Sequence, residues 1–299
     1  MILKPECLLC CLKMALEIAK LATQEEALLK TVLLKTMKVL EELPEDVDSF
    51  LVGLKVHEIL EAVSGNADPC REIRETNNKQ AENLIPIVTD WVDKHPDPLW
   101  AASKAAVMGN LIDMIASTPT DSAQLIDNYL DRPYAVDDLK AFQSILEKAK
   151  KVVYLGDNAG EVFFDRLFIQ RLNLPTLFFV KGFPFANDAQ YVDAILAGIH
   201  EVATIKVVPL SKPLAVNMNT VDGMYADFLH AAQEADLVVI KGQANYELFR
   251  PKLKEAFYLF VHKCPVIARM DGTNIGDMVF FRRTNESIRK QMGLGELDG

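Results

Sequence analysis

The sequence lacks any apolar run long enough to cross a bilayer, and its first residues lack the charged, apolar and cleavage regions of a secretory signal peptide. These absences predict a soluble, cytoplasmic protein. An excess of basic residues is missing too, since the formal net charge is -10. A nucleic-acid binder needs a basic surface to neutralise phosphates, so we expect neither nucleic acid nor membrane as a partner. A small phosphorylated substrate stays compatible, because one local positive site can hold it. Nothing in the sequence specifies an oligomeric state.

Cysteine is scarce, and its placement excludes a disulfide framework. Three of the five cysteines, Cys7, Cys10 and Cys11, fall within five residues, and cytosolic thiols are normally reduced. The Cys7–Cys10 spacing fits a metal-binding or redox pair. Zinc normally takes four ligands, however, so a structural or incidental role is favoured and a metal or redox role is the alternative. The five histidines are scattered, which disfavours a histidine-based zinc hydrolase.

Glycine-rich nucleotide motifs are also absent. Residues 156–160 read Gly-Asp-Asn-Ala-Gly and lack the second glycine of Gly-x-Gly-x-x-Gly, which lets a pyrophosphate approach the backbone. No Walker pattern occurs either. Dinucleotide-dependent enzymes are therefore disfavoured.

The first part of the chain has the apolar spacing of helices. Residues such as Ala15 and Ile18 recur three and four positions apart, and no alternating strand pattern occurs. We therefore predict an all-α N-terminal domain at 1–120. Near its end, Asn110 and Asp113 lie on one side of a mostly apolar helix. They could stand behind the ligands of a catalytic cleft, or only cap a neighbouring loop.

The rest of the chain alternates short apolar runs with helical patterns, which is typical of a doubly wound, mostly parallel sheet. We predict an α/β catalytic domain at 121–299 that begins with a helix at 135–150 and ends in a polar tail at 285–299. The predicted strands are 152–155, 176–180, 204–208, 237–240 and 266–268. The predicted helices between them are 162–172, 188–197, 222–234 and 251–260.

Polar residues follow the first predicted strand directly. Asp157 and Asn158 stand between Gly156 and Gly160, at the turn into a helix. Either residue alone would be interpreted as a helix cap. As a pair after a buried strand they favour a ligand site, since ligands of open α/β sheets bind at the carboxyl ends of strands. Their oxygens are hard donors suited to Mg²⁺ or Mn²⁺.

The turn after the second predicted strand contains Asn187 and Asp188. By topology this turn lies beside the first, so Asp188 could supply a third metal ligand. Three protein ligands leave positions open for water and a phosphate oxygen. Asn187 is a candidate substrate contact, and both residues could instead be helix caps.

Lysines stand at two further strand ends. Lys241 ends an apolar strand, an unfavourable place for a charge without a partner. It either reaches water or clamps a phosphate, with Gly242 allowing a close backbone approach and Asn245 donating a hydrogen bond. Lys263 is a second candidate clamp, and an exposed edge lysine is an equally good interpretation.

Six segments match one known family in their order and spacing. They are 5–10, 109–113, 156–160, 184–188, 241–246 and 263–264. Together they resemble the DUF89 family, whose members are also described as damage-control phosphatases and are related to a human protein once called an acidic-residue methyltransferase. The resemblance covers nearly the whole chain. The Cys-x-x-Cys is similar to that of the stand-alone prokaryotic branch.

The resemblance implies a divalent-metal-dependent phosphatase that uses Mn²⁺, Co²⁺ or Ni²⁺, with Mg²⁺ often poorer. The implied metal ligands are Asp157, Asn158 and Asp188, and the implied phosphate contacts are Asn245 and Lys263, with Lys241 in the same substrate loop. Gln243, also in that loop, stands where eukaryotic members carry an aspartate, which leaves the ligand set intact and the identity of the substrate open.

Our main hypothesis is hydrolysis of a small phosphomonoester, such as a sugar phosphate or a damaged phosphometabolite. The attacking group would be a metal-activated water or the carboxylate of Asp157 or Asp188. One alternative is a methyltransferase that uses S-adenosylmethionine, although Lys181 stands where such enzymes usually have an acidic residue. Another is a non-enzymatic protein that binds a phosphometabolite or a metal.

Overall fold

The computed structural model describes residues 3–43, 49–112, 126–209 and 223–284. Within these ranges the chain forms a seven-stranded sheet in the order β1-β7-β6-β5-β2-β3-β4. Neighbouring strands are parallel except β6 with β7. The strands are β1 (Val136–Asp137), β2 (Val152–Leu155), β3 (Thr176–Val180), β4 (Thr204–Val207), β5 (Leu237–Lys241), β6 (Glu255–Val261) and β7 (Met278–Thr284). The predicted α/β class with a mostly parallel sheet is confirmed.

The centre of the sheet is formed by β2, with β3 on one side and β5 on the other. Every residue of β2 and β5 is buried, as expected for parallel strands covered on both faces. In the register, Leu155 lies opposite Phe179 of β3 and Ile240 of β5. The three strands therefore end at one edge of the sheet, and the turns that follow them lie side by side.

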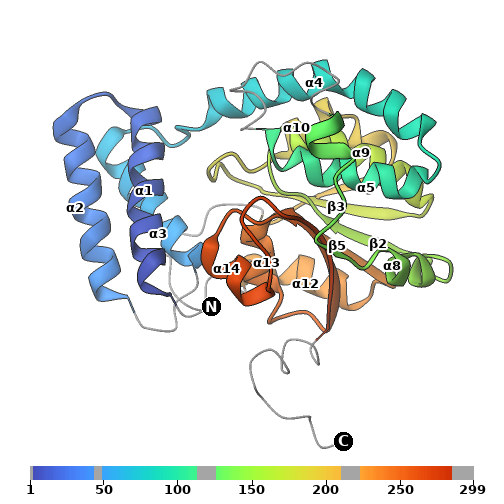
Figure 1. Cartoon of the computed structure of the whole chain (residues 1–299). Coiled ribbons are helices and arrows are strands. Elements are labelled where there is room, and N and C mark those ends of the chain that lie inside the picture. Colours follow the sequence, from blue (N-terminus) through green and yellow to red (C-terminus); the bar gives the residue numbers. More distant parts are fainter. Residues whose placement is uncertain (1–2, 44–48, 113–125, 210–222, 285–299) are drawn as a thin grey trace, which may run out of the picture.

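Helices cover both faces of the sheet, and Figure 1 shows α4, α5, α9 and α10 on one side with α12, α13 and α14 on the other. The helices are α1 (Pro5–Ala22), α2 (Glu26–Glu42), α3 (Ser49–Ser64), α4 (Arg71–Lys94), α5 (Pro98–Gly109), α8 (Leu139–Leu146), α9 (Glu161–Leu172), α10 (Tyr191–Leu196), α12 (Ala226–Gln233), α13 (Gln243–Phe249) and α14 (Pro265–Asp271). None of the helices in the described ranges is both long enough and apolar enough to cross a membrane.

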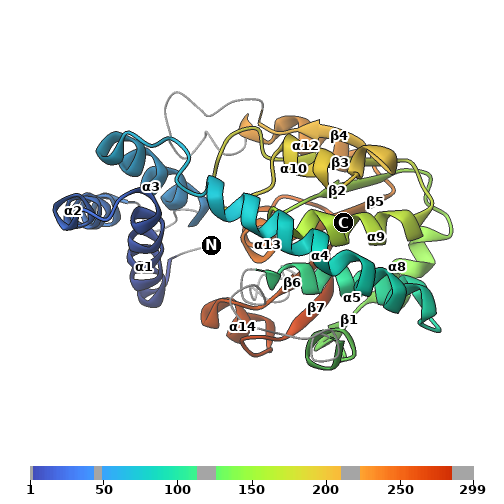
Figure 2. The ribbon, with the colours of Figure 1, turned by 90° about the horizontal axis from the view of Figure 1, so that it is seen from above.

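The predicted N-terminal domain contains two kinds of helix. Helices α1 to α3 pack together beside the sheet and share a small apolar cluster that includes Ala15, Val32 and Leu60. Helix α4 extends from them across the sheet, and Figure 2 shows it beside α5 and α9. Residues of α4 and α5 belong to the same apolar cluster as the sheet. The predicted boundary at 120 lies outside the described residues, so the division into domains stays a prediction.

The predicted helix at 251–260 is wrong, because β6 occupies Glu255–Val261. This run, Glu-Ala-Phe-Tyr-Leu-Phe-Val, is buried after its first residue and lies between β5 and β7. A run that is apolar at nearly every position fits a buried strand as well as a buried helix, so periodicity could not separate the two.

The predicted strand at 266–268 is also wrong, because these residues belong to α14. Pro265 stands at the first turn of this helix, where its fixed φ is favourable, and Gly272 ends the helix in the left-handed region. Strands β1 and β7 were not predicted. The predicted helix at 135–150 is reduced to α8, with β1 in front of it, and the tail at 285–299 lies outside the described residues.

Candidate active site

The turn after β2 is held in place by α4. Gly160 precedes α9 with a φ of 77°, and a Cβ there would lie 2.7 Å from the carbonyl oxygen of Asn77. The Gly160 amide donates to Oδ1 of Asn78 at 2.7 Å, and Nδ2 of Asn78 donates to Oδ1 of Asp193 at 2.6 Å. Glycine thus permits the close approach of α4, and Asn78 links this turn to the start of α10.

The turns after β2 and β3 are joined to each other by backbone contacts. Asn158 and Asp188 form an antiparallel bridge, and the amide of Ala189 donates to the carbonyl oxygen of Asp157 at 2.8 Å. The three residues predicted as metal ligands, Asp157, Asn158 and Asp188, therefore lie on two turns that are hydrogen-bonded together.

Three side-chain amides point at the carboxylate of Asp157. Its Oδ2 accepts from Nδ2 of Asn158 at 2.8 Å and from Nδ2 of Asn110 at 3.2 Å. Its Oδ1 accepts from Nδ2 of Asn245 at 3.2 Å. The turn after β5 comes equally close, since a Cβ on Gly242 would lie 2.0 Å from Oδ2 of Asp157. Asp157 is thus fixed from three elements of the fold.

Both predicted ligand carboxyls are buried in a way that opposes ionisation. Burial, followed by repulsion from Glu161 and Asp188, raises the pKa of Asp157 well above its ordinary value. Burial also raises the pKa of Asp188 to about 6, although Lys181 and Arg74 act in the opposite direction. A cation placed between the two carboxyls would favour their charged forms.

The donor set fits a hard divalent cation. Asp157 and Asp188 offer carboxylate oxygens, and Asn158 offers an amide oxygen, because its Nδ2 is already directed at Asp157 and Glu161. Among the described residues, no group of three or more His, Cys, Asp or Glu side chains is placed to hold a metal ion. A metal centre on these turns would therefore depend on the Asn158 amide.

Lys241 lies in the interior, with its side chain fully buried. Its Nζ donates to Oε1 of Glu161 at 2.5 Å, to Oδ1 of Asp165 at 2.8 Å and to the carbonyl oxygen of Ala106 at 2.8 Å. These three acceptors use all three donors of an ammonium group. The structure thus places Lys241 in an internal ion cluster with α5 and α9, and gives no support to the predicted phosphate clamp.

Lys181 lies beside the candidate metal ligands, although the sequence analysis gave it no role in the site. Its Nζ lies 3.7 Å from Oδ2 of Asp188 and donates to Oδ1 of Asn245 at 3.0 Å and to the Tyr225 hydroxyl at 2.9 Å. Burial alone lowers the pKa of Lys181, but Tyr225 and Asp188 more than offset this, so the pKa is raised and the ammonium is kept. The available signal was its place at the end of β3.

Three further predicted substrate contacts, Lys263, Gln243 and Asn245, follow β5 and β6. Lys263 is exposed, and its positive charge opposes part of the rise in the pKa of Asp157, so this cation lies near the site on its solvent side. Oε1 of Gln243 accepts from the amides of Lys263 and Cys264 at 2.8 Å and 3.0 Å. Gln243 therefore connects the two turns, and Asn245 lies against Asp157 as described above.

Known proteins are similar to this chain in sequence and in fold. The sequence matches the family model of the damage-control phosphatase ARMT1-like domain over residues 3–279. The chain belongs to this family. A DUF89 family protein from Pyrococcus horikoshii has the same fold, with a TM-score of 0.83 and 25% identity over 95% of this chain and 100% of that one. The predicted family is therefore confirmed.

Two relatives in this family carry the name of a phosphatase. A damage-control phosphatase from Archaeoglobus fulgidus is 29% identical, and the alignment covers 93% of this chain and 98% of the relative. A damage-control phosphatase from Pyrococcus horikoshii is 26% identical over 93% and 96% of the two chains. An uncharacterized protein of Methanocaldococcus jannaschii is 30% identical over 94% and 95%. A phosphatase role is thus supported for the family.

Three further residues predicted to belong to the site are Asn187, Asn110 and Asp113. Asn187 is half-buried, and its carbonyl oxygen accepts from the amide of Ala159 at 2.9 Å. Asn110 contacts Asp157 directly, and its Oδ1 accepts from the amide of Val261 at 3.3 Å. It therefore stands behind the candidate ligands, which is one of the two places predicted for it. Asp113 lies outside the described residues.

The Cys7 and Cys10 pair lies on the first turns of α1. Both are free thiols, Cys10 is exposed, and burial raises the pKa of each thiol above its ordinary value. A raised pKa leaves less of the reactive thiolate. No third cysteine, histidine or carboxylate among the described residues completes a metal site with them. Their redox or metal role stays a prediction.

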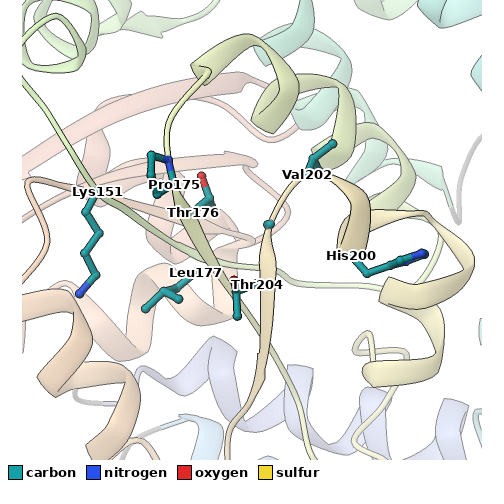
Figure 3. A pocket seen from close by; sticks show the side chains of 8 residues that line it. Lys151, Pro175, Thr176, Leu177, His200, Val202 and Thr204 are labelled. Atoms are coloured by element: carbon teal, nitrogen blue, oxygen red, sulfur yellow. The ribbon is translucent and has the colours of Figure 1, made fainter.

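A separate hollow of about 410 Å³ opens at the other edge of the sheet (Figure 3). It lies where β3 and β4 begin, so it is at the opposite ends of the strands from the candidate active site. Its lining residues include Lys151, Thr176, His200 and Thr204. None of the family motifs described above lies in this hollow.

Proposed function

We propose that this protein is a divalent-metal-dependent phosphatase that hydrolyses small phosphomonoesters, such as sugar phosphates or damaged phosphometabolites. The main support is that the turns carrying Asp157, Asn158 and Asp188 are hydrogen-bonded to each other. The buried Lys181 and the exposed Lys263 lie beside them. A dianionic phosphate suits such a site, because its charge is complementary to a bound divalent cation and to Lys181 and Lys263.

The residues would divide the work by position. Asp157, Asn158 and Asp188 would hold the metal, which supplies Lewis-acid stabilisation of charge on the phosphoryl oxygens. Lys181 would supply a fixed positive charge from within the protein, and Lys263 would approach the phosphate from the solvent side. The amide of Asn245 orients Asp157 and is itself oriented by Lys181.

The attacking group is either a water molecule or one of the carboxylates of Asp157 and Asp188. Each carboxylate lies on a turn at the carboxyl ends of the strands, where a phosphate ester could reach it. Rapid quenching of a single turnover with a substrate labelled in its phosphate distinguishes the two routes, because only attack by a carboxylate transfers the phosphoryl group to the protein as an acyl phosphate before water releases it.

We propose Mn²⁺, Co²⁺ or Ni²⁺ as the metal, with Mg²⁺ as a weaker substitute, a small phosphorylated metabolite as the partner, and the cytoplasm as the place of action. The donor set of two carboxylates and one amide accepts all four ions, so activity and not binding must rank them.

The test is phosphate release by metal-stripped protein on a panel of phosphomonoesters, with Mn²⁺, Co²⁺, Ni²⁺ or Mg²⁺ restored one at a time. We expect activity with at least one transition ion and its loss in Asp157→Ala. No release with any ion, or full activity in Asp157→Ala, would refute the proposal. S-adenosylmethionine in a calorimeter tests the methyltransferase alternative, and no contact in the site favours it.

A further inference from the structure

The internal ion cluster contains two carboxylates that share one lysine but differ in what else they touch. Nζ of Lys241 contacts Oε1 of Glu161 and Oδ1 of Asp165, and all three side chains are fully buried. The cluster lies directly beneath the candidate active site, where β5 meets α9. The two carboxylates come from the same helix, one turn apart.

Only Glu161 reaches the active-site turns. Its second oxygen, Oε2, accepts from Nδ2 of Asn110 at 3.0 Å and from Nδ2 of Asn158 at 3.2 Å. Asp165 faces the core instead. Its Oδ1 accepts from the Tyr154 hydroxyl at 2.7 Å, and its Oδ2 has no hydrogen-bond partner in the described part of the chain.

The contact with Glu161 decides which end of the Asn158 amide faces a cation. Nδ2 of Asn158 carries two hydrogens, and the two carboxylates that they approach belong to Asp157 and Glu161. With both hydrogens directed there, the Oδ1 atom is the end left for a metal. If Glu161 lost its charge or moved, the amide could rotate by half a turn and present a donor to the cation, which repels it.

Lys241 offsets the cost of burying these carboxylates in the interior. Three carboxylates, from Asp157, Glu161 and Asp165, lie within one buried region, where like charges repel one another. The Lys241 ammonium neutralises part of that charge and hydrogen-bonds the face of Glu161 that points away from the site. The lysine thus acts on the site through Glu161 and not by touching a substrate.

We infer that Glu161, held by Lys241, is a positioning residue that orients the Asn158 amide so that its oxygen faces the metal. This inference rests on the proposed function, since it assigns Asn158 as a metal ligand. It also replaces the phosphate clamp predicted for Lys241 with a role at the base of the metal site.

Two matched variants separate this role from simple charge balance. Glu161→Gln and Asp165→Asn each replace a buried carboxylate of the same helix that contacts Lys241, without changing its shape. In Glu161→Gln the new amide must turn a donor either toward Lys241 or toward Asn158, so one of the two contacts is lost. In Asp165→Asn the contacts of Glu161 with Asn110 and Asn158 are kept.

The measurement is Mn²⁺ affinity of the metal-stripped proteins by calorimetry, with thermal unfolding in a chelator as the stability readout. We expect Glu161→Gln to weaken Mn²⁺ binding by roughly 10- to 100-fold, as for other residues that support metal ligands. Asp165→Asn should stay within about twofold of the parent, whatever its thermal stability. Equal losses of affinity in the two variants would overturn the inference.

A third variant protects the test against misfolding. Glu161→Gln and Asp165→Asn combined with Lys241→Met remove all three buried charges of the ion cluster, so none of them is left without a partner. We expect this triple variant to fold and to bind Mn²⁺ as weakly as Glu161→Gln. Affinity equal to that of the parent protein would refute the positioning role.

Kinetic measurements and the behaviour of the parent protein show whether the role of Glu161 or the proposed function itself has failed. At saturating Mn²⁺ the kcat of Glu161→Gln should recover toward the parent value, with the KM for substrate little changed, because the defect lies in metal binding. A parent protein that binds no Mn²⁺ and releases no phosphate would refute the proposed function itself. A parent that does both, with equal losses in the two single variants, would refute only the role of Glu161.

Discussion

Lys181 and Gly182 follow β3, and Lys241 and Gly242 stand at the end of β5. The two lysines nevertheless contact different parts of the protein. Lys181 contacts Asp188 and Asn245 beside the candidate active site. Lys241 contacts Glu161 and Asp165 beneath it. The same two residues, at the ends of the two strands that flank β2, thus have different surroundings.

The cause is a difference of one residue in register. Successive side chains of a strand point to opposite faces, so Lys241 continues the row of Leu237 and Val239. These residues face the helices of the α5 and α9 side. Lys181 continues the row of Phe179, which faces the apolar cluster on the other side. The lesson is that a strand-end lysine can be assigned only after its face is known.

The largest expected effect is on stability, in Lys241→Met. Removing this ammonium leaves the buried carboxylates of Glu161 and Asp165 without their cation, so we expect a loss of about 3–5 kcal/mol in the free energy of unfolding. Urea unfolding measures it. Lys263→Met, at the exposed lysine, is the control and should change stability by about 0.5 kcal/mol or less. A loss of stability in Lys241→Met as small as that in Lys263→Met would contradict the internal role assigned to Lys241.

The next effect is on catalysis, in Lys181→Met. We expect kcat/KM for phosphate release to fall by about 100- to 1,000-fold, as when one preorganised donor to a transition-state oxygen is removed. Its stability should fall less than that of Lys241→Met. Lys206→Met, at an exposed lysine of β4, is the matched control and should keep its activity. An activity loss no larger than in the control would remove Lys181 from the site.

The glycine of the β5 turn gives a third test. A Cβ at Gly242 would collide with Asp157, and its φ of 84° disfavours alanine as well. We expect Gly242→Ala to weaken Mn²⁺ binding by at least about tenfold, as for other changes that displace a ligand. Gly272→Ala has a similar φ of 71° but open space around its Cβ, so it should lower stability and leave Mn²⁺ affinity unchanged. Similar Mn²⁺ affinities in Gly242→Ala and Gly272→Ala would show that the close approach of Gly242 to Asp157 does not matter for metal binding.

The smallest effect is a pH dependence. Each lysine faces a carboxyl whose pKa burial raises to about 6, Asp188 for Lys181 and Asp165 for Lys241. A carboxyl with a pKa higher in the folded protein than in the unfolded chain binds its proton more tightly when folded. It therefore lowers stability as pH rises from about 4 through about 6.

Asp188→Asn removes this contribution from the metal-stripped protein. We expect the variant to gain about 1–3 kcal/mol over the parent above pH 6 and nothing below pH 4, by urea unfolding across that range. Saturating Mn²⁺ should reverse the difference, because the metal stabilises only the parent carboxylate. A gain that does not depend on pH would show that repulsion and burial at Asp188 were misassigned.

Much of the framework followed from local pattern. Strands β2, β3 and β5 are apolar runs, and these three and β4 match their predicted ranges closely. Parallel strands end at one edge of the sheet. Asp157, Asn158 and Asp188 could therefore be expected on adjacent turns before any contact was known. Predictions for β6 and α14 failed, because an apolar run of five to seven residues has no period that separates strand from helix.

The sequence by itself determined the family, the α/β class and the oxygen donors at the strand ends, because these depend on residue type and order. Only the tertiary structure decided which lysine faces the site. Strands buried on both faces show no polar alternation, so register against neighbouring strands sets the direction of each side chain. It also brought Glu161 onto Lys241, a contact that spans 80 residues and exists only after the sheet and α9 have packed.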